Sequence, residues 1–135
     1  MITAIVYDTA TGIGSHKVVA QSQAAIDLQA NIGQAVYMGE FDIATEFLDP
    51  NNGYTVMPRP LMNVQQDKLA IASDGVDTIT ISNIPNGAEC SHPEGSFVAT
   101  PADNTATWSC NTPGTYLFVF RLAPYQDCVV YVEVI

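Results

Sequence analysis

Residues 111–120 read NTPGTYLFVF, and this stretch decides how the second half of the chain is interpreted. The Pro-Gly dipeptide at 113–114 is typical of a tight turn, and an apolar and aromatic run follows it. Because side chains alternate between the two faces of a strand, Tyr116, Phe118 and Phe120 share one face. The stretch therefore predicts a turn that leads into a core strand of a β module.

Short apolar runs separated by turn residues recur throughout the second half of the chain. We expect seven strands, at 68–73, 77–85, 88–92, 96–100, 105–110, 115–122 and 128–135. Strands of this length with turns at roughly 8–12-residue spacing are typical of an immunoglobulin-like β-sandwich, in which two sheets pack face to face.

The core of this sandwich is expected to contain the chain's single tryptophan. Trp108 shares a strand face with Ala106 and Cys110, and we expect it to pack against Phe118 or Phe120. The aliphatic side chains expected to face the same core are Leu69, Ile71, Ile79 and Ile81.

The first half predicts a smaller set of strands. Residues 2–8 and 15–21 are expected to pair as a hairpin. Residues 24–31 are expected to form a half-buried strand, with a short helix as the alternative, and residues 33–42 a strand and turn. A second hairpin is expected over 44–60, around the turn DPNNG at 49–53.

Two prolines mark the boundary between the halves. Pro58 and Pro60 interrupt strand pairing, so we place the module boundary near Gln66. The predicted fold class is all-β, with a small β-rich N-terminal module at 1–66 followed by an immunoglobulin-like sandwich at 67–135.

Composition narrows the classes of function. The 135 residues include 14 acidic and four basic side chains, for a net charge of −10, which would repel nucleic acid and anionic membrane surfaces. We expect no nucleic-acid partner and no membrane insertion, because no apolar run approaches the roughly 18 residues of a membrane span. The opening residues also lack the basic segment of a secretory signal peptide.

The number of cysteines indicates the redox compartment in which the protein is made. An odd count of three, without an export signal, indicates synthesis in a reducing cytoplasm with thiols buried as small hydrophobes. The alternative for Cys90 and Cys110 is a disulfide. Cys90 and His92 form a C-x-H pair to which Cys110 could add a third zinc ligand, but without a second close pair we favour a core cysteine beside an exposed histidine.

No catalytic, metal-binding or cofactor-binding residue is assigned. His16 and His92 lie far apart in sequence, and there is neither a G-x-S-x-G elbow nor a complete phosphate-binding glycine loop. Glu40, Asp42 and Glu46 read as a solvated acidic edge, because nothing apolar surrounds them to raise a pKa.

Aromatic residues of the first module offer an alternative role. Tyr37, Phe41, Phe47 and Tyr54 could form a platform for sugar rings, although core packing accounts for most of them.

The last strand predicts an interface. In CVVYVEVI, residues 128–135, apolar groups occupy both faces, whereas a lone sandwich exposes one polar face. We expect a neighbouring subunit or partner to cover the face that carries Val129, Tyr131, Glu133 and Ile135.

The whole arrangement resembles small structural proteins of tailed bacteriophages, in the tail-fibre and tail-fibre-assembly-like class. The likeness rests on AIVYDTATG, GEFD, ATEFLD and GYTVMPRP in the first half. In the second half it rests on IASDGVDTITISNIPNG and TPGTYLFVFRLAPYQDCVVYVEV.

The resemblance implies a non-enzymatic component of the virion, associated with the tail or tail fibre, made in the host cytoplasm and bound to other virion proteins. It carries no active site and no cofactor to transfer. The apolar groups on both faces of the final strand predict a homo-oligomer, and a trimer is favoured because trimers are common among the fibre-like proteins that the chain resembles. The alternatives are an adhesin-like or glycan-binding sandwich module, or a capsid decoration protein.

Overall fold

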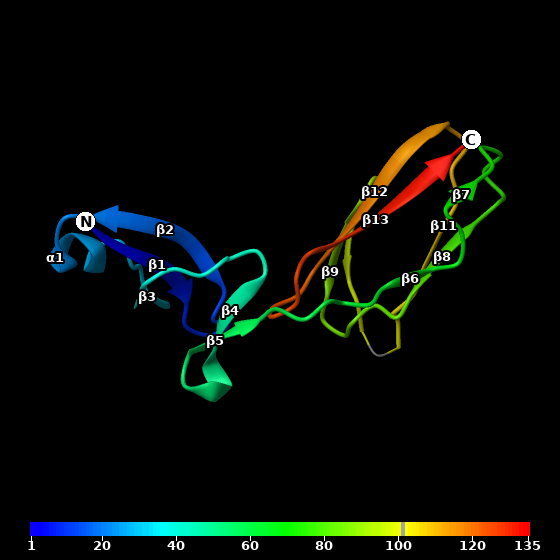
Figure 1. Ribbon diagram of the computed structural model, residues 1–135. Helices are drawn as coiled ribbons and strands as arrows, with labels where there is room; N and C mark the ends of the chain where they lie inside the picture. The colour runs from blue at the N-terminus through cyan, green and yellow to red at the C-terminus, as the bar shows by residue number, and fades with distance from the viewer. Residues whose placement is uncertain (101) are drawn as a thin grey trace. The chain divides into compact units, whose positions relative to one another are not determined.

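The computed structural model describes residues 1–100 and 102–135. Within them nearly all regular structure is β-strand, which confirms the predicted all-β class (Figure 1). The chain divides into two compact units, Met1–Pro60 and Leu61–Ile135.

A three-stranded antiparallel sheet forms the centre of the first unit. Strand β1 (Ile2–Asp8) lies between β2 (Gly14–Ala20) and β3 (Gln34–Met38). Ala4, Ile5, Val6 and Tyr7 of β1 are all buried, as expected for a central strand covered on both faces. The predicted hairpin of 2–8 with 15–21 is therefore confirmed.

The strand expected at 24–31 is wrong, and its helical alternative is present. Helix α1 (Gln23–Asp27) begins at Ser22, whose Oγ accepts a hydrogen bond from the backbone N–H of Ala25 at 3.2 Å. This N-cap satisfies one of the free donors of the first turn. A strand would place Ile26 and Leu28 on one face, whereas Ile26 is fully buried and Leu28 is 83% exposed.

The second hairpin of this unit is confirmed. Strands β4 (Glu46–Asp49) and β5 (Thr55–Pro58) pair antiparallel, and the short 3-10 helix η1 (Pro50–Asn52) joins them. The hairpin is attached to the first sheet where the N–H of Leu48 donates to the carbonyl oxygen of Gly12 at 2.9 Å. Gly12 has a φ of 75°, and a Cβ there would lie 1.6 Å from the Leu48 carbonyl oxygen, so this close approach requires glycine.

Over residues 61–100 and 102–135 the second unit contains eight strands. In chain order they are β6 (Gln65–Gln66), β7 (Ala70–Ile71), β8 (Ile79–Ser82), β9 (Glu89–His92), β10 (Gly95–Val98), β11 (Ala106–Trp108), β12 (Gly114–Arg121) and β13 (Cys128–Val134). They form a five-stranded sheet in the order β10-β9-β12-β13-β7 and a three-stranded sheet in the order β11-β8-β6. When β13, β12 and β9 are aligned with strands G, F and C of an immunoglobulin sandwich, β6, β8 and β11 correspond to A, B and E.

One apolar core joins the two sheets. It contains Ile79 and Ile81 from the three-stranded sheet and Phe118, Phe120 and Val132 from the five-stranded sheet, all almost completely buried. Figure 1 shows β9, β12 and β13 on one side of this core and β6, β8 and β11 on the other.

Trp108 links the two sheets, as predicted. Its ring meets that of Phe118 edge to face, with centroids 5.4 Å apart and an interplanar angle of 77°. A second edge contact joins Trp108 to Tyr116, with centroids 5.0 Å apart. Aromatic pairs in this geometry add to the stabilisation that burial alone provides.

The boundary between the units lies at Pro60 rather than near Gln66. Met62 is 5% exposed in the core of the second unit, and Gln65 and Gln66 pair with Ser82 and Ile81 of β8. The segment that follows the prolines therefore belongs to the sandwich.

Leu69 does not face the core and is 75% exposed, so that expectation was wrong. Strand β7 is only two residues long and pairs parallel with Glu133 and Val134 at the end of β13. Leu69 precedes β7 and contributes its carbonyl oxygen, which accepts the N–H of Glu133 at 3.1 Å, while Ile71 is the buried side chain.

We predict that residues 61–135 fold alone and that residues 67–135 are less stable. The shorter fragment loses the buried Met62 side chain and the pairing of β6, and the loss of a buried methionine alone costs about 2 kcal/mol or more. Urea denaturation of the two fragments, followed by tryptophan fluorescence, measures the difference. Equal free energies of unfolding would show that 61–66 is merely a linker.

Replacing Trp108 with alanine is expected to destabilise the second unit by about 3 to 5 kcal/mol, because the change opens a cavity between the two sheets. Thermal and urea denaturation followed by circular dichroism give the magnitude. Val98→Ala is the control, since Val98 is exposed on edge strand β10 and should tolerate truncation. A Trp108→Ala protein with the wild-type melting temperature would contradict the described packing.

Candidate functional site

The candidate site is the face of β12 and β13 that points away from the core. In their antiparallel pairing Leu117 lies opposite Tyr131, and Val119 lies opposite Val129. Their sequence neighbours Phe118, Val130 and Val132 point inward and are buried, so alternation places these four side chains outside. We call Leu117, Val119, Val129 and Tyr131 the outer face.

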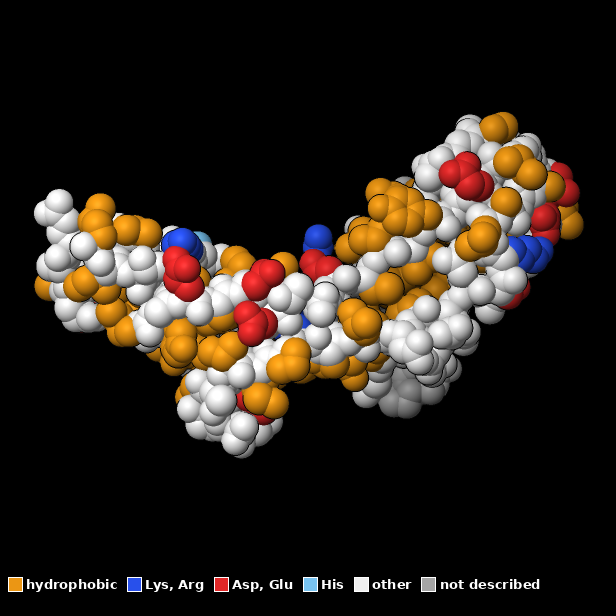
Figure 2. Space-filling model, in the orientation of Figure 1, with side chains coloured by type: hydrophobic (Ala, Val, Ile, Leu, Met, Phe, Trp, Pro, Cys, Tyr) orange, Lys and Arg blue, Asp and Glu red, His pale blue; other side chains and the backbone are white. Residues whose placement is uncertain are grey.

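The outer face is apolar and open to solvent. Leu117 is 45%, Val129 41% and Tyr131 60% exposed, and Val119 is half-buried. Figure 2 shows hydrophobic side chains gathered over this part of the second unit. Single exposed hydrophobic residues are ordinary on protein surfaces, but a contiguous group bordered by polar residues is typical of an interaction surface.

Polar pairs border the outer face at both ends. At one end the Thr115 hydroxyl donates to a carboxylate oxygen of Glu133 at 2.8 Å. At the other end Arg121 donates through Nε to Asp127 at 3.2 Å and lies opposite Glu89 of β9. An apolar centre with a polar rim is the usual anatomy of a protein–protein interface.

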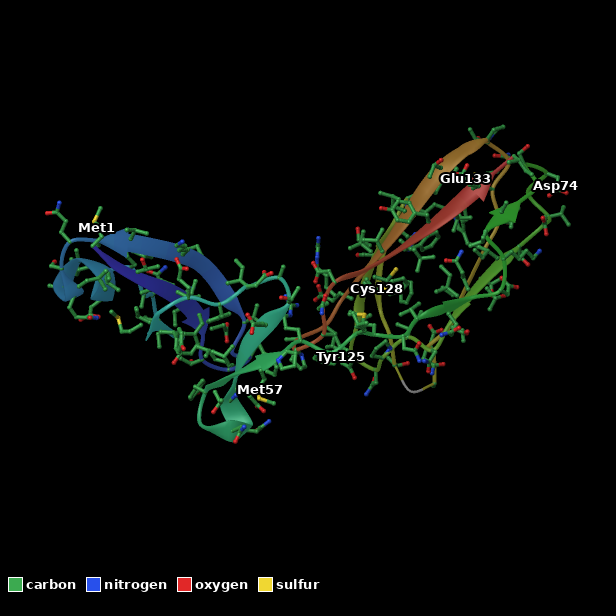
Figure 3. The ribbon with its side chains drawn as sticks, viewed as in Figure 1. Met1, Met57, Asp74, Tyr125, Cys128 and Glu133 are labelled. Carbon is green, nitrogen blue, oxygen red and sulfur yellow. The ribbon has the colours of Figure 1, made fainter. Side chains whose placement is uncertain are left out.

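The structure brings together three of the four residues predicted for an interface. Val129, Tyr131 and Glu133 occupy one face of β13, and Figure 3 shows Cys128 and Glu133 towards opposite ends of that strand. Ile135 is exposed beyond the strand, and its backbone N–H donates to the Ile71 carbonyl oxygen at 3.0 Å. Whether a partner covers these residues stays a prediction.

Sequence reasoning missed the contribution of β12. The same alternation that placed Phe118 and Phe120 inside also places Leu117 and Val119 outside, so the signal was present in the stretch TYLFVF. The pairing register of β12 with β13 was the missing information, because it joins the two strands into one continuous surface.

The cysteines are all free, so the alternative Cys90–Cys110 disulfide is not formed. Cys90 lies inside the sandwich, where burial raises the pKa of its thiol to about 11. Burial also raises the pKa of the half-buried Cys128. A thiol that stays protonated at neutral pH is a poor nucleophile and a poor metal ligand.

Metal ligation by the C-x-H pair gains no support from the geometry. Cys90 and His92 lie two residues apart in β9 and therefore share its inward face. Cys90 is buried there, and the half-buried His92 ring stacks on Phe118 with centroids 5.9 Å apart and planes at 16°, so the expectation of an exposed histidine was wrong. Among residues 1–100 and 102–135, no group of three or more histidine, cysteine or acidic side chains is arranged to hold a metal ion.

The acidic residues of the first unit stabilise local structure. Glu40 forms an ion pair with Lys17. Asp42 Oδ1 accepts the Ala44 N–H at 3.0 Å, and a carboxylate oxygen of Glu46 accepts the Asp42 N–H at 3.1 Å. These contacts order the turn that precedes β4. Glu40 and Asp42 line one surface pocket together with Lys17, whereas Glu46 does not line it.

The aromatic residues proposed for a sugar platform are divided among different contacts. Tyr37 meets Phe41 edge to face at 5.6 Å, whereas the Tyr54 ring packs against Tyr7 at 5.5 Å and its hydroxyl donates to the Thr9 carbonyl oxygen. Phe47 is buried. The four rings therefore do not form one platform.

A charged cluster that the sequence reading overlooked fixes a loop of the second unit. Lys68 donates through Nζ to Asp77 at 2.5 Å, and this hydrogen bond is the main cause that holds the Asp77 pKa below its usual value. The backbone N–H groups of Asp77 and Val76 likewise lower the pKa of Asp74. The cluster connects the ends of the segment between β7 and β8, so we assign it a structural role.

Comparison with known proteins assigns the chain to no family. No protein-family model matches the chain. Searches of curated proteins and of solved structures found no match either. Over the part of the chain that the structure describes, no helix combines the length and hydropathy that crossing a bilayer requires.

Proposed function

We propose that the protein is a non-enzymatic structural component of a bacteriophage virion, associated with the tail or tail fibre. In this proposal the sandwich binds other virion proteins or further copies of the same chain. A homo-oligomer, with a trimer favoured, is the assembly that the final strand and the resemblance of the sequence suggest.

The observation that carries this proposal is the outer face. Leu117, Val129 and Tyr131 present exposed apolar and aromatic groups on a rigid two-strand platform, and tyrosine is enriched at protein interfaces. The rim provides hydrogen-bonding groups of both kinds at Glu133 and Arg121. A surface with this composition suits a protein partner, because its apolar centre is unfavourable in water and gains free energy when it is covered.

The open edge of β13 provides a second means of attachment. Among the described residues, β7 pairs with β13 only at Glu133 and Val134, and the Gln66 side chain donates through Nε2 to the Tyr131 carbonyl oxygen at 3.3 Å, so this edge is only partly covered. Unpaired strand edges readily accept another strand. The edge and the outer face lie on the same strand, so one partner can use both.

We predict that the double substitution Val129→Lys with Tyr131→Glu abolishes assembly and leaves the sandwich folded. Both side chains are exposed in the isolated chain, so the fold should tolerate charge there, whereas burying two charges in an interface carries a large desolvation cost. Sedimentation velocity over a range of concentrations measures assembly, and circular dichroism reports the fold.

The matched control is Ile32→Glu with Val76→Lys, which introduces the same two charges at exposed apolar positions that do not belong to the outer face. The control protein should assemble like wild type. The proposal fails if the wild-type chain remains monomeric at high concentration and cross-linking within virions finds no partner on the outer face.

A further inference from the structure

A pocket of about 230 Å³ opens at the edge of the sandwich, away from the outer face. At this edge β10 ends the five-stranded sheet and β11 ends the three-stranded sheet. The side chains that matter for its chemistry are His92, Glu94, Phe97, Asp103, Trp108 and Phe118.

Aromatic rings form the apolar part of the pocket. His92 stacks on Phe118 and lies 5.9 Å from Phe97, and Trp108 meets the edge of Phe118. Four rings from four different strands thus converge at one site. Such rings offer flat, weakly polar surfaces against which the C–H faces of a small ring can pack.

Polar groups complete the pocket. The carboxylates of Glu94 and Asp103 make neither an ion pair nor a hydrogen bond within residues 1–100 and 102–135, and both can accept. His92 accepts the Glu94 N–H through Nδ1 at 3.3 Å, so its neutral ring carries a proton on Nε2. The indole Nε1–H of Trp108 is buried and has no hydrogen-bond partner among the same residues.

The unpaired indole N–H is the observation that most restricts the ligand. A buried donor without an acceptor costs free energy, so a ligand that supplies an acceptor gains that amount on binding. Nε1 is covered by the residues that the structure describes, so a ligand atom reaches it only after a neighbouring side chain moves aside.

We propose that this pocket binds one ring of a neutral sugar. A hydroxyl group can accept from the Trp108 indole and also donate to the carboxylate of Glu94 or Asp103, which an ammonium group cannot do. An anionic ligand is disfavoured by these two carboxylates and by the net charge of −10. The proposal is independent of the virion function, because the pocket and the outer face share no residue.

The single tryptophan of the chain gives a direct test. The full chain labelled with ¹⁵N has one indole N–H resonance, which reports only on Trp108. Titration with methyl glycosides of glucose, galactose, mannose and N-acetylglucosamine should move this resonance saturably for at least one sugar. The expected dissociation constant is on the order of a millimolar, as is usual for a ligand of this size.

Asp103→Asn and Glu94→Gln should each weaken binding of that sugar by roughly tenfold, because each removes a charged acceptor. Glu89→Gln is the matched control, since Glu89 is exposed on the opposite face of β9 and does not line the pocket. The Val129→Lys and Tyr131→Glu protein should retain full sugar binding, which separates this proposal from the assembly function.

Two results would overturn the proposal. One is an indole resonance that no glycoside in the panel moves at 50 mM, well above the expected constant of roughly a millimolar. The other is a resonance that moves with n-butylammonium alone, which would assign the pocket to a cationic side chain of a protein partner.

Discussion

Strand β12 is the element on which the second unit depends, because it is paired on both edges and buries its inward face in the core. Its hydrogen-bond ladder joins β13 over 114–120 and β9 over 119–121. Its inward side chains Phe118 and Phe120 are almost completely buried against the other sheet. Because side chains alternate between the two faces of a strand, fixing the inward residues of β12 also determines which residues face outward.

The two candidate sites follow from this constraint. The outward residues of β12 and β13 form the outer face. Their apolar side chains stay exposed because only the side chains at the alternate, inward-facing positions are buried in the core. The inward ring of Phe118 reaches the edge of the sandwich and becomes part of the pocket between β10 and β11. One strand thus supplies both an assembly surface and a pocket wall, with the core between them.

Local patterns in the sequence predicted the features that depend on alternation and turns. The hairpins, the inward faces of β12 and β13 and the Trp108–Phe118 contact all follow from period-two patterns flanked by turn residues. For the segment 24–31 a strand was preferred over a short helix, and Leu69 was assigned to the core because it lies two residues before Ile71. An N-cap at Ser22 and the shortness of β7 decided those cases.

The pocket was not predicted because it depends on long-range register. Its rings come from β9, β10, β11 and β12. In sequence, Trp108 and Phe118 were interpreted as core residues and His92 as an exposed histidine. The boundary at Pro60 was missed for a similar reason, since the burial of Met62 depends on strands that follow it in the chain. Neither contact leaves a local signal, so only the folded arrangement reveals them.

Amide hydrogen exchange of the intact chain tests the central role of β12 most directly. The account predicts that the amides of 118–120 exchange only through global unfolding of the second unit, and therefore most slowly. Edge strand β10 should exchange by local opening at rates at least about tenfold faster, since opening an edge exposes less buried surface. Equal rates in β12 and β10, or faster exchange in β12, would contradict the account.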